Sequence, residues 1–113
     1  MMRIRRSFVT ATVAMLPALS LSGVGFTAPV ARTHTIHLKG LKFGPAPERV
    51  RVGDRVEWVN DDIFRHTATA RNGAFDVDLA PGARAQVLLK RAGAIDYYCR
   101  YHPGMTGRLT VTR

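Results

Sequence analysis

The chain has 113 residues, with 17 Lys and Arg against 8 Asp and Glu, and a formal net charge of +9. This length leaves room for one domain. The positive charge suits an acidic protein, a membrane or nucleic acid. However, the basic residues stand singly or in pairs, which argues against nucleic acid. The single cysteine, Cys99, excludes an internal disulfide.

The first 31 residues have the order of an export signal. A basic head with three arginines precedes an apolar stretch from residue 8 to about residue 24, and small residues follow. We expect residues 1–31 to be a signal peptide, cut between residues 25 and 31, with an uncleaved anchor as the alternative. The pair Arg5-Arg6 also resembles the twin-arginine signal, and the general secretory route stays open. Either route predicts a bacterial periplasmic location.

Residues 32–113 predict an all-β domain. Apolar and polar residues alternate with the period of β-strands, and Gly and Pro turn signals separate the runs. The predicted strands cover residues 33–38, 49–52, 55–59, 66–70, 85–89, 94–98 and 108–112. No stretch of ten residues after residue 31 has a helical period. Seven or eight short strands indicate an antiparallel sandwich or barrel.

Three potential metal ligands follow one another at intervals of three residues. Cys99, His102 and Met105 lie on a predicted loop between two strands. Thiolate and thioether are soft donors, and imidazole suits copper as well as zinc. Zinc sites avoid methionine, so this set favours copper. The loop offers one histidine, and the strongest candidate for a second is His66, which begins a predicted strand directly after a loop.

Other readings of the titratable residues are weaker. His34 and His37 lie in the first predicted strand, where we expect them at the surface or an edge. The pair Asp61-Asp62 is expected to form a solvated turn rather than a cation site. A thiol enzyme would need a base beside Cys99 and a substrate cleft. Such an enzyme leaves Met105 unexplained, so we expect no enzymatic activity.

These motifs, in this order, resemble the cupredoxin family, and most of all the amicyanin, pseudoazurin and plastocyanin-like group. The resemblance rests on Trp58-Val59-Asn60, His66-Thr67-Ala68-Thr69, Phe75-Asp76, Pro81-Gly82, Tyr97-Tyr98-Cys99, His102-Pro103-Gly104-Met105 and Gly107. It implies a Greek-key β-sandwich and one type 1 copper ion. It also implies His66, Cys99 and His102 as equatorial ligands and Met105 as a weak axial ligand. The implied function is single-electron transfer, and a copper carrier or storage protein is the alternative.

One residue departs from the family pattern. Many cupredoxins have an asparagine after the first histidine ligand that ties the two ligand loops together. This chain has Thr67 there, and its hydroxyl is expected to do part of that work. His102, next to Pro103, is expected to be the electron port, with Phe64 among the candidates for its rim.

The resemblance also implies redox proteins as partners. Removing residues 1–31 would remove three arginines and no acid, leaving a net charge of +6. This charge favours partners with acidic docking surfaces. We expect a monomer that binds no nucleic acid and has no stable membrane insertion once the signal is removed.

Overall fold

The computed structural model describes residues 7, 9–18, 23, 25 and 30–113. About half of the predicted signal segment, residues 1–31, thus lies outside the described residues, including the Arg5-Arg6 pair and most of the predicted cut region. Within the described residues, no helix is long and apolar enough to cross a bilayer. The strands are β1 (Thr33–Lys39), β2 (Lys42–Phe43), β3 (Val50–Arg51), β4 (Arg55–Asn60), β5 (His66–Ala70), β6 (Asp76–Leu79), β7 (Arg84–Leu88), β8 (Gly93–Tyr98) and β9 (Thr106–Thr112).

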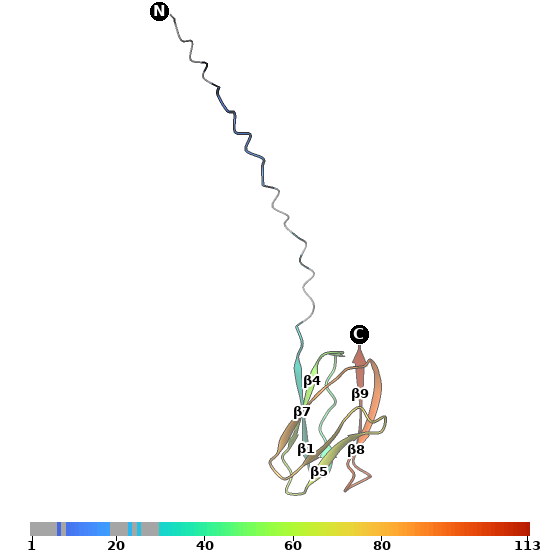
Figure 1. The fold of residues 1–113 in the computed structure, drawn as a ribbon. Coiled ribbons are helices and arrows are strands. Elements are labelled where there is room, and N and C mark those ends of the chain that lie inside the picture. Colours follow the sequence, from blue (N-terminus) through green and yellow to red (C-terminus); the bar gives the residue numbers. More distant parts are fainter. Residues whose placement is uncertain (1–6, 8, 19–22, 24, 26–29) are drawn as a thin grey trace, which may run out of the picture.

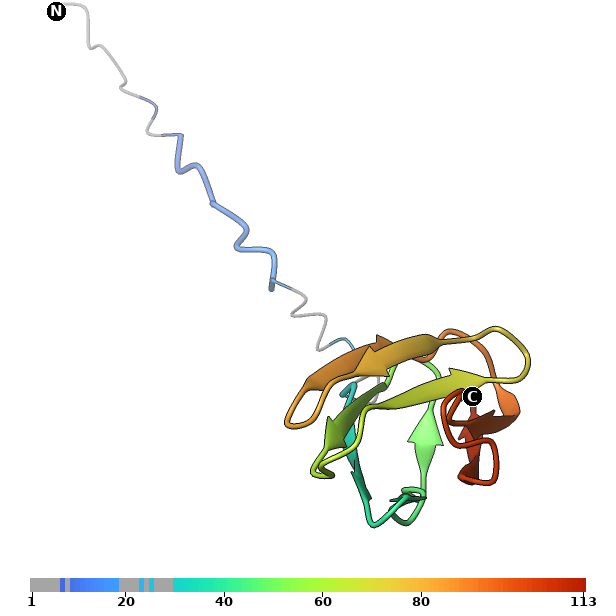
Figure 2. The same ribbon diagram turned by 90° about the horizontal axis from the view of Figure 1, so that it is seen from below.

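The strands form two sheets around one core (Figure 1; Figure 2). One sheet has the order β2-β1-β4-β7 and the other has the order β3-β9-β8-β5-β6. Most neighbouring strands are antiparallel, but β1 runs parallel to β4 and β3 runs parallel to β9. The predicted all-β architecture is confirmed. The described domain has nine strands rather than seven or eight, and two of its strand pairs are parallel.

Sequence reasoning missed two of these strands for different reasons. Strand β2 has only two residues, too few to show a period. Strand β6 alternates outward Asp76 and Asp78 with the more buried Val77 and Leu79, but its acidic residues resemble a turn. It pairs along β5, so that Thr69 lies opposite Asp76. The omission matters because β6 supports the candidate site described below.

An aromatic cluster fills the core. Trp58 lies between Phe43, Phe75 and Tyr97, with ring centroids 5.0–5.8 Å from its own. Tyr97 faces Gly107 across the β8–β9 pair. A Cβ at residue 107 would lie 2.3 Å from the Tyr97 ring, so only glycine leaves space for this tyrosine. The cluster locks the two sheets together beneath the loops that connect them.

The strand directions give the domain two distinct ends. The β4–β5 loop (residues 61–65) and the β8–β9 loop (residues 99–105) lie at one end, which we call the site end. The chain from residue 30 joins the domain at the opposite end, where β9 also finishes; we call this the distal end (Figure 1). Seven strand residues span about 20 Å, so the two ends are well separated.

Candidate metal centre

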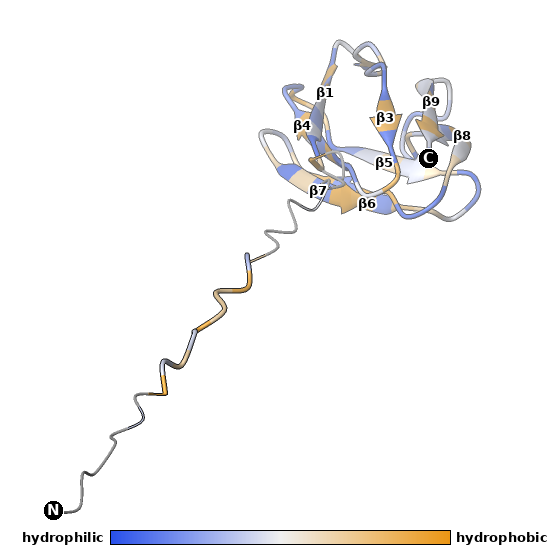
Figure 3. Cartoon of the chain, turned by 90° about the horizontal axis from the view of Figure 1, so that it is seen from above, coloured by the Kyte–Doolittle hydropathy of each residue, from blue (hydrophilic) through white to orange (hydrophobic). Residues whose placement is uncertain are grey.

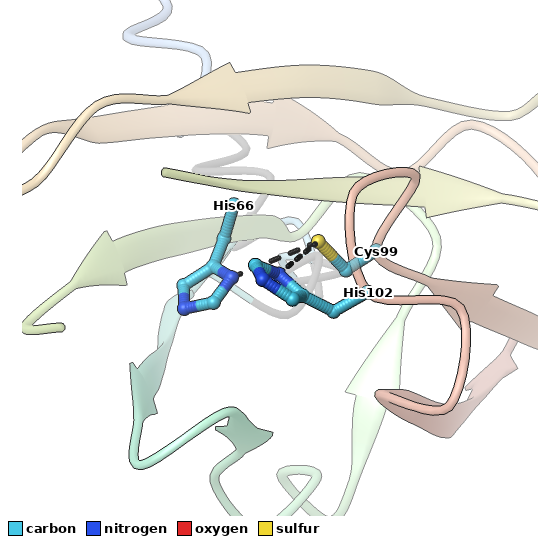
Figure 4. A group of neighbouring side chains, drawn as sticks. All are labelled: His66, Cys99 and His102. Carbon is cyan, nitrogen blue, oxygen red and sulfur yellow. Dashed lines mark hydrogen bonds between the residues drawn. The ribbon is translucent and has the colours of Figure 1, made fainter. Parts of the chain in front are cut away.

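Three of the predicted ligands meet at the site end, as Figure 4 shows. Cys99 Sγ lies 3.7 Å from His66 Nδ1 and 3.8 Å from His102 Nδ1, and the three donor atoms are all within 4.8 Å of one another. Metal–nitrogen and metal–sulfur bonds of about 2.0 and about 2.3 Å, at trigonal angles, separate sulfur from nitrogen by about 3.7 Å. The donors therefore fit a single metal ion with a copper-type ligand set.

His66 is held by the loop that precedes it. Asn60 is fully buried at the end of β4, and its Nδ2 donates to the carbonyls of Phe64 and Leu79 at 2.8 and 2.9 Å. Its Oδ1 accepts from the backbone N–H of Asp62 at 2.9 Å. One buried amide thus shapes the whole β4–β5 loop, and β5 then begins with the buried His66 facing the site.

Asp62 orients the His66 ring. Its Oδ2 lies 2.9 Å from His66 Nε2, and only 9% of its side chain is exposed. When Nε2 donates to this carboxylate, the neutral ring keeps its lone pair on Nδ1, which faces Cys99. The hydrogen bonds from His66 and from the backbone N–H of Leu41 lower the pKa of Asp62 to about 2.

The predicted solvated turn is therefore wrong for Asp62, which serves a histidine of the site. It holds for the exposed Asp61, whose carboxylate pairs with His37 instead. A signal for the role of Asp62 was present in the sequence, because a carboxylate four residues before a histidine can reach its ring when the intervening loop is tight.

The β8–β9 loop closes on itself. The backbone N–H of Cys99 donates to the Met105 carbonyl at 3.1 Å, and that of Met105 donates to the His102 carbonyl at 2.8 Å. Cys99 and Met105 are buried in the core cluster, whereas His102 is partly exposed. The Phe64 ring lies 6.0 Å from the His102 ring, as expected for a rim residue. The loop thus combines a buried thiol with a histidine that reaches the surface.

Cys99 lies among hydrogen-bond donors. Burial alone raises the pKa of its thiol, but the N–H of Thr67, at 3.3 Å, and the imidazoles of His102 and His66 lower it to about 6. The thiolate is the form that binds a metal. The surroundings of Cys99 therefore favour its thiolate form at neutral pH.

Thr67 ties the two ligand loops together, as the sequence predicted. Its Oγ1 accepts the backbone N–H of Arg100 at 2.8 Å and lies 2.9 Å from the Thr69 hydroxyl. Thr69 donates to Asp76 Oδ1 at 2.8 Å, so Thr67 must be the donor to Thr69. A directed chain of hydrogen bonds therefore runs from the Arg100 backbone through two hydroxyls to a carboxylate on β6.

Surface ion pairs hold the same loops against β6. Arg65 Nε lies 2.7 Å from Asp78 Oδ1, and the Tyr101 hydroxyl donates to the other oxygen of Asp78 at 2.7 Å. The Arg100 side chain reaches Asp76 at 3.2 Å. These contacts follow from strand β6, which sequence reasoning missed, so the roles of its two aspartates were missed as well.

The other histidines stand apart from this cluster. His34 bonds the buried Asp54 at 2.8 Å near the distal end, and His37 is exposed. Among residues 30–113, only His66, Cys99 and His102 form a group of three or more close His, Cys, Asp or Glu donors. The expected surface position is confirmed for His37 but is wrong for His34, of whose side chain only 13% is exposed.

Comparisons of the sequence with known proteins find two relatives. No family model matches the chain. It is 32% identical to a plastocyanin of Nostoc punctiforme, over 94% of this chain and 93% of that protein. It is 24% identical to the amicyanin of Paracoccus versutus, over 67% of this chain and 62% of that one.

A solved structure shows the same fold. The crystal structure of Paracoccus versutus amicyanin superposes with a TM-score of 0.60 at 23% identity, covering 70% of this chain and 80% of that one. The matched share of the chain is about the size of its nine-stranded part.

Proposed function

This chain belongs to the cupredoxin family together with plastocyanin and amicyanin, and we propose that it binds one copper ion and carries single electrons between redox proteins. The observation that carries the proposal is the meeting of Cys99, His66 and His102 within 4.8 Å. We assign these three as the main ligands. We assign Met105, on the same loop, as the weak axial ligand. A copper ion held this way supplies a one-electron couple.

The residues around the ligands keep them in one arrangement. Asp62 fixes the His66 ring. The hydrogen bond from the Arg100 N–H to the Thr67 hydroxyl fixes the loop that bears Cys99 and His102. A site that is rigid without relying on the metal needs little rearrangement when the charge on the metal changes by one. This favours an electron carrier over a copper carrier or storage protein, which needs an exchangeable site. We expect no enzymatic activity.

We propose that electrons pass through His102. It is the ligand that reaches the surface, and Phe64 beside it is 46% exposed. Redox partners would dock on this apolar area at the site end. Near it, Arg65 and Arg100 are already paired with β6 carboxylates, so the unpaired charge there is modest.

The net charge remains a reason to propose partners with acidic docking surfaces. Lys39 and Lys42 are exposed at the site end and are available for such contacts. Electron-exchange rates with an acidic redox protein should then fall as salt rises, because salt screens the attraction. A flat salt response would show that docking is apolar.

We also propose that residues 1–31 direct export and that the mature protein works in the periplasm. The basic head, apolar stretch and small residues support this reading. The mass of the protein recovered from a periplasmic fraction would locate the cut. Replacing Arg5 and Arg6 by lysine should block export only if the twin-arginine route is used.

One experiment tests the copper assignment directly. Copper(II) is added to the purified protein, and the visible and electron paramagnetic resonance spectra are recorded. An intense thiolate-to-copper band that bleaches reversibly on reduction supports electron transfer, and Cys99→Ser should abolish it. His37→Ala is the matched control and should keep the band. A colourless protein that takes only zinc or copper(I) would support the carrier or storage alternative.

A further inference from the structure

Every described carboxylate except that of Glu48 contacts a basic side chain. Four form ion pairs with arginine, namely Arg65–Asp78, Arg84–Glu57, Arg100–Asp76 and Arg108–Asp96. The other three accept hydrogen bonds from histidines, in the pairs His34–Asp54, His37–Asp61 and His66–Asp62. The excess positive charge of the domain therefore lies on the basic residues outside these pairs.

Most of that excess gathers at the distal end. We define the distal basic surface by its six exposed basic residues, none of which forms an ion pair within residues 30–113. They are Arg32, Arg51, Arg55, Lys90, Arg91 and Arg113. Six basic residues at one end of the domain create a local positive potential.

Backbone contacts show that these residues are neighbours. The backbone N–H groups of Arg32 and Arg51 both donate to Asp54, at 2.9 and 3.0 Å. Arg55 donates its N–H to the Arg32 carbonyl at 2.8 Å. Asp54 is buried and also hydrogen-bonds His34. Its carboxylate offsets one of the six positive charges, so the distal basic surface keeps a clear positive excess.

The other three basic residues line one shallow concavity. Lys90, Arg91 and Arg113 surround it together with Val52 and Ala92. Val52 is 40% exposed, and Leu88, on the adjoining strand, is 41% exposed. Basic side chains around small exposed apolar groups form a surface with affinity for an anionic interface.

The N-terminal segment enters the domain at this end. Residues 9–18 are largely apolar (Figure 3), and the chain joins the domain at Arg32, within the distal basic surface. Because the proposed cleavage removes this segment, the distal basic surface must hold the mature domain at the membrane without it. A redox partner bound here would be about 20 Å from the ligand loops, the length of a seven-residue strand. This surface is therefore poorly placed for electron exchange and well placed for holding the domain with its site end free.

We propose that the distal basic surface binds the headgroups of an anionic phospholipid bilayer and orients His102 away from the membrane. Four to eight clustered Lys and Arg residues are the number typical of attraction to anionic membranes. The attraction acts at the surface and inserts no strand. An acidic protein bound at the distal end is the competing occupant, and the test separates the two.

The test uses the full chain without copper, so its outcome is independent of the proposed electron transfer. Binding is measured by co-sedimentation with phosphatidylcholine vesicles, with and without phosphatidylglycerol, at low and high salt. We expect binding that requires phosphatidylglycerol and weakens with salt. The double variant Lys90→Gln/Arg91→Gln should reduce the affinity tenfold or more. The control Lys39→Gln/Lys42→Gln removes the same charge at the site end and should change it less than twofold.

Both double variants keep the N-terminal segment, so its own affinity for lipid cancels in the comparison. Unchanged thermal unfolding curves would confirm that both remain folded. Equal losses from the two variants would mean that only the net charge matters, and the proposal would be overturned. It would also be overturned if the copper-free distal variant bound vesicles as the unaltered chain does but bound an acidic protein more weakly.

Discussion

His66 and Asp62, four residues apart, meet through a 2.9 Å contact between Nε2 and Oδ2, on the side of the imidazole ring that faces away from Cys99. This contact selects the ring nitrogen that is left free for a metal. It places a carboxylate behind one ligand, an arrangement that raises the basicity of the histidine and fixes its orientation. The first prediction follows from it.

Asp62→Ala should weaken copper(II) binding by about 10- to 100-fold, because His66 loses both its orientation and its charged partner. Asp62→Asn should lose less, since an amide oxygen can still accept the Nε2 proton. The measurement is competition with a chelator of known affinity. Asp61→Ala is the control, because Asp61 is exposed and pairs only with His37. An equal loss in that control would contradict the role given to Asp62.

The hydrogen bonds that link Arg100, Thr67, Thr69 and Asp76 predict graded losses in the free energy of unfolding. Thr67→Val removes the acceptor of the Arg100 N–H and should cost about 1–3 kcal/mol in the free energy of unfolding. Thr69→Val leaves that acceptor in place but removes the partner of the Thr67 hydroxyl, so about 1 kcal/mol is expected. Thr35→Val, on an exposed strand face, should be nearly neutral.

Spectroscopy separates a positioning role from a purely structural one for the same variants. With copper bound, Thr67→Val and Thr69→Val should both shift the visible thiolate band, because the loop that bears Cys99 and His102 relaxes. A stability loss with an unchanged band would limit Thr67 to holding the fold.

Gly107→Ala tests the packing of the core. Its Cβ would overlap the Tyr97 ring, so the tyrosine or strand β9 must move, at a cost of about 1–3 kcal/mol. Urea unfolding followed by Trp58 fluorescence measures it, since Trp58 packs against Tyr97. Gly104→Ala is the control, because its Cβ would meet no atom within 4 Å. Equal midpoints for these two variants would contradict the close-approach argument.

The lowered pKa of Asp54 predicts that the folded protein loses stability in acid. Burial raises the pKa of this carboxyl, but the N–H of Arg32, the imidazole of His34 and the N–H of Arg51 lower it from 3.8 to about 2. Because the folded-state pKa is the lower one, this stabilisation is complete above pH 4 and is lost as the pH falls through 2. Unfolding free energies of the copper-free protein and of Asp54→Asn, measured from pH 6 to 2, should differ by about 1–2 kcal/mol at pH 6 and converge in acid. A difference independent of pH would contradict the assignment.

The proposed ligands could be selected from the sequence because each carries its own signal. Cys99, His102 and Met105 stand at fixed intervals between two recognisable strands, and His66 begins a strand after a polar loop. The buried face of a strand could also be predicted where apolar residues alternate with polar ones, as at Ile36 and Leu38 in β1. Local period and donor chemistry were enough for these features.

What could not be predicted depends on contacts between distant residues. Thr69 meets Asp76 only because β5 pairs with β6 in one register, and no local pattern fixes that register. The parallel pairing of β3 with β9 joins residues about 60 positions apart. The clustering of basic residues at one end likewise appears only when strand directions are known, since they are scattered along the sequence.

The pairing of β3 with β9 has a consequence for the order of events during folding. Strand β9 directly follows Met105 and is the last of the described strands, and its partner β3 lies in the first half of the domain. Such long-range closure is slow, because the intervening chain must be ordered first. The Cys99–Met105 loop itself is closed by the local pairing of β8 with β9. His66 reaches Cys99 and His102 only when β5 also pairs with β8. The four proposed ligands are therefore not yet assembled in a chain synthesised only as far as Met105, and a copper ion that meets all four meets a chain that already includes β9.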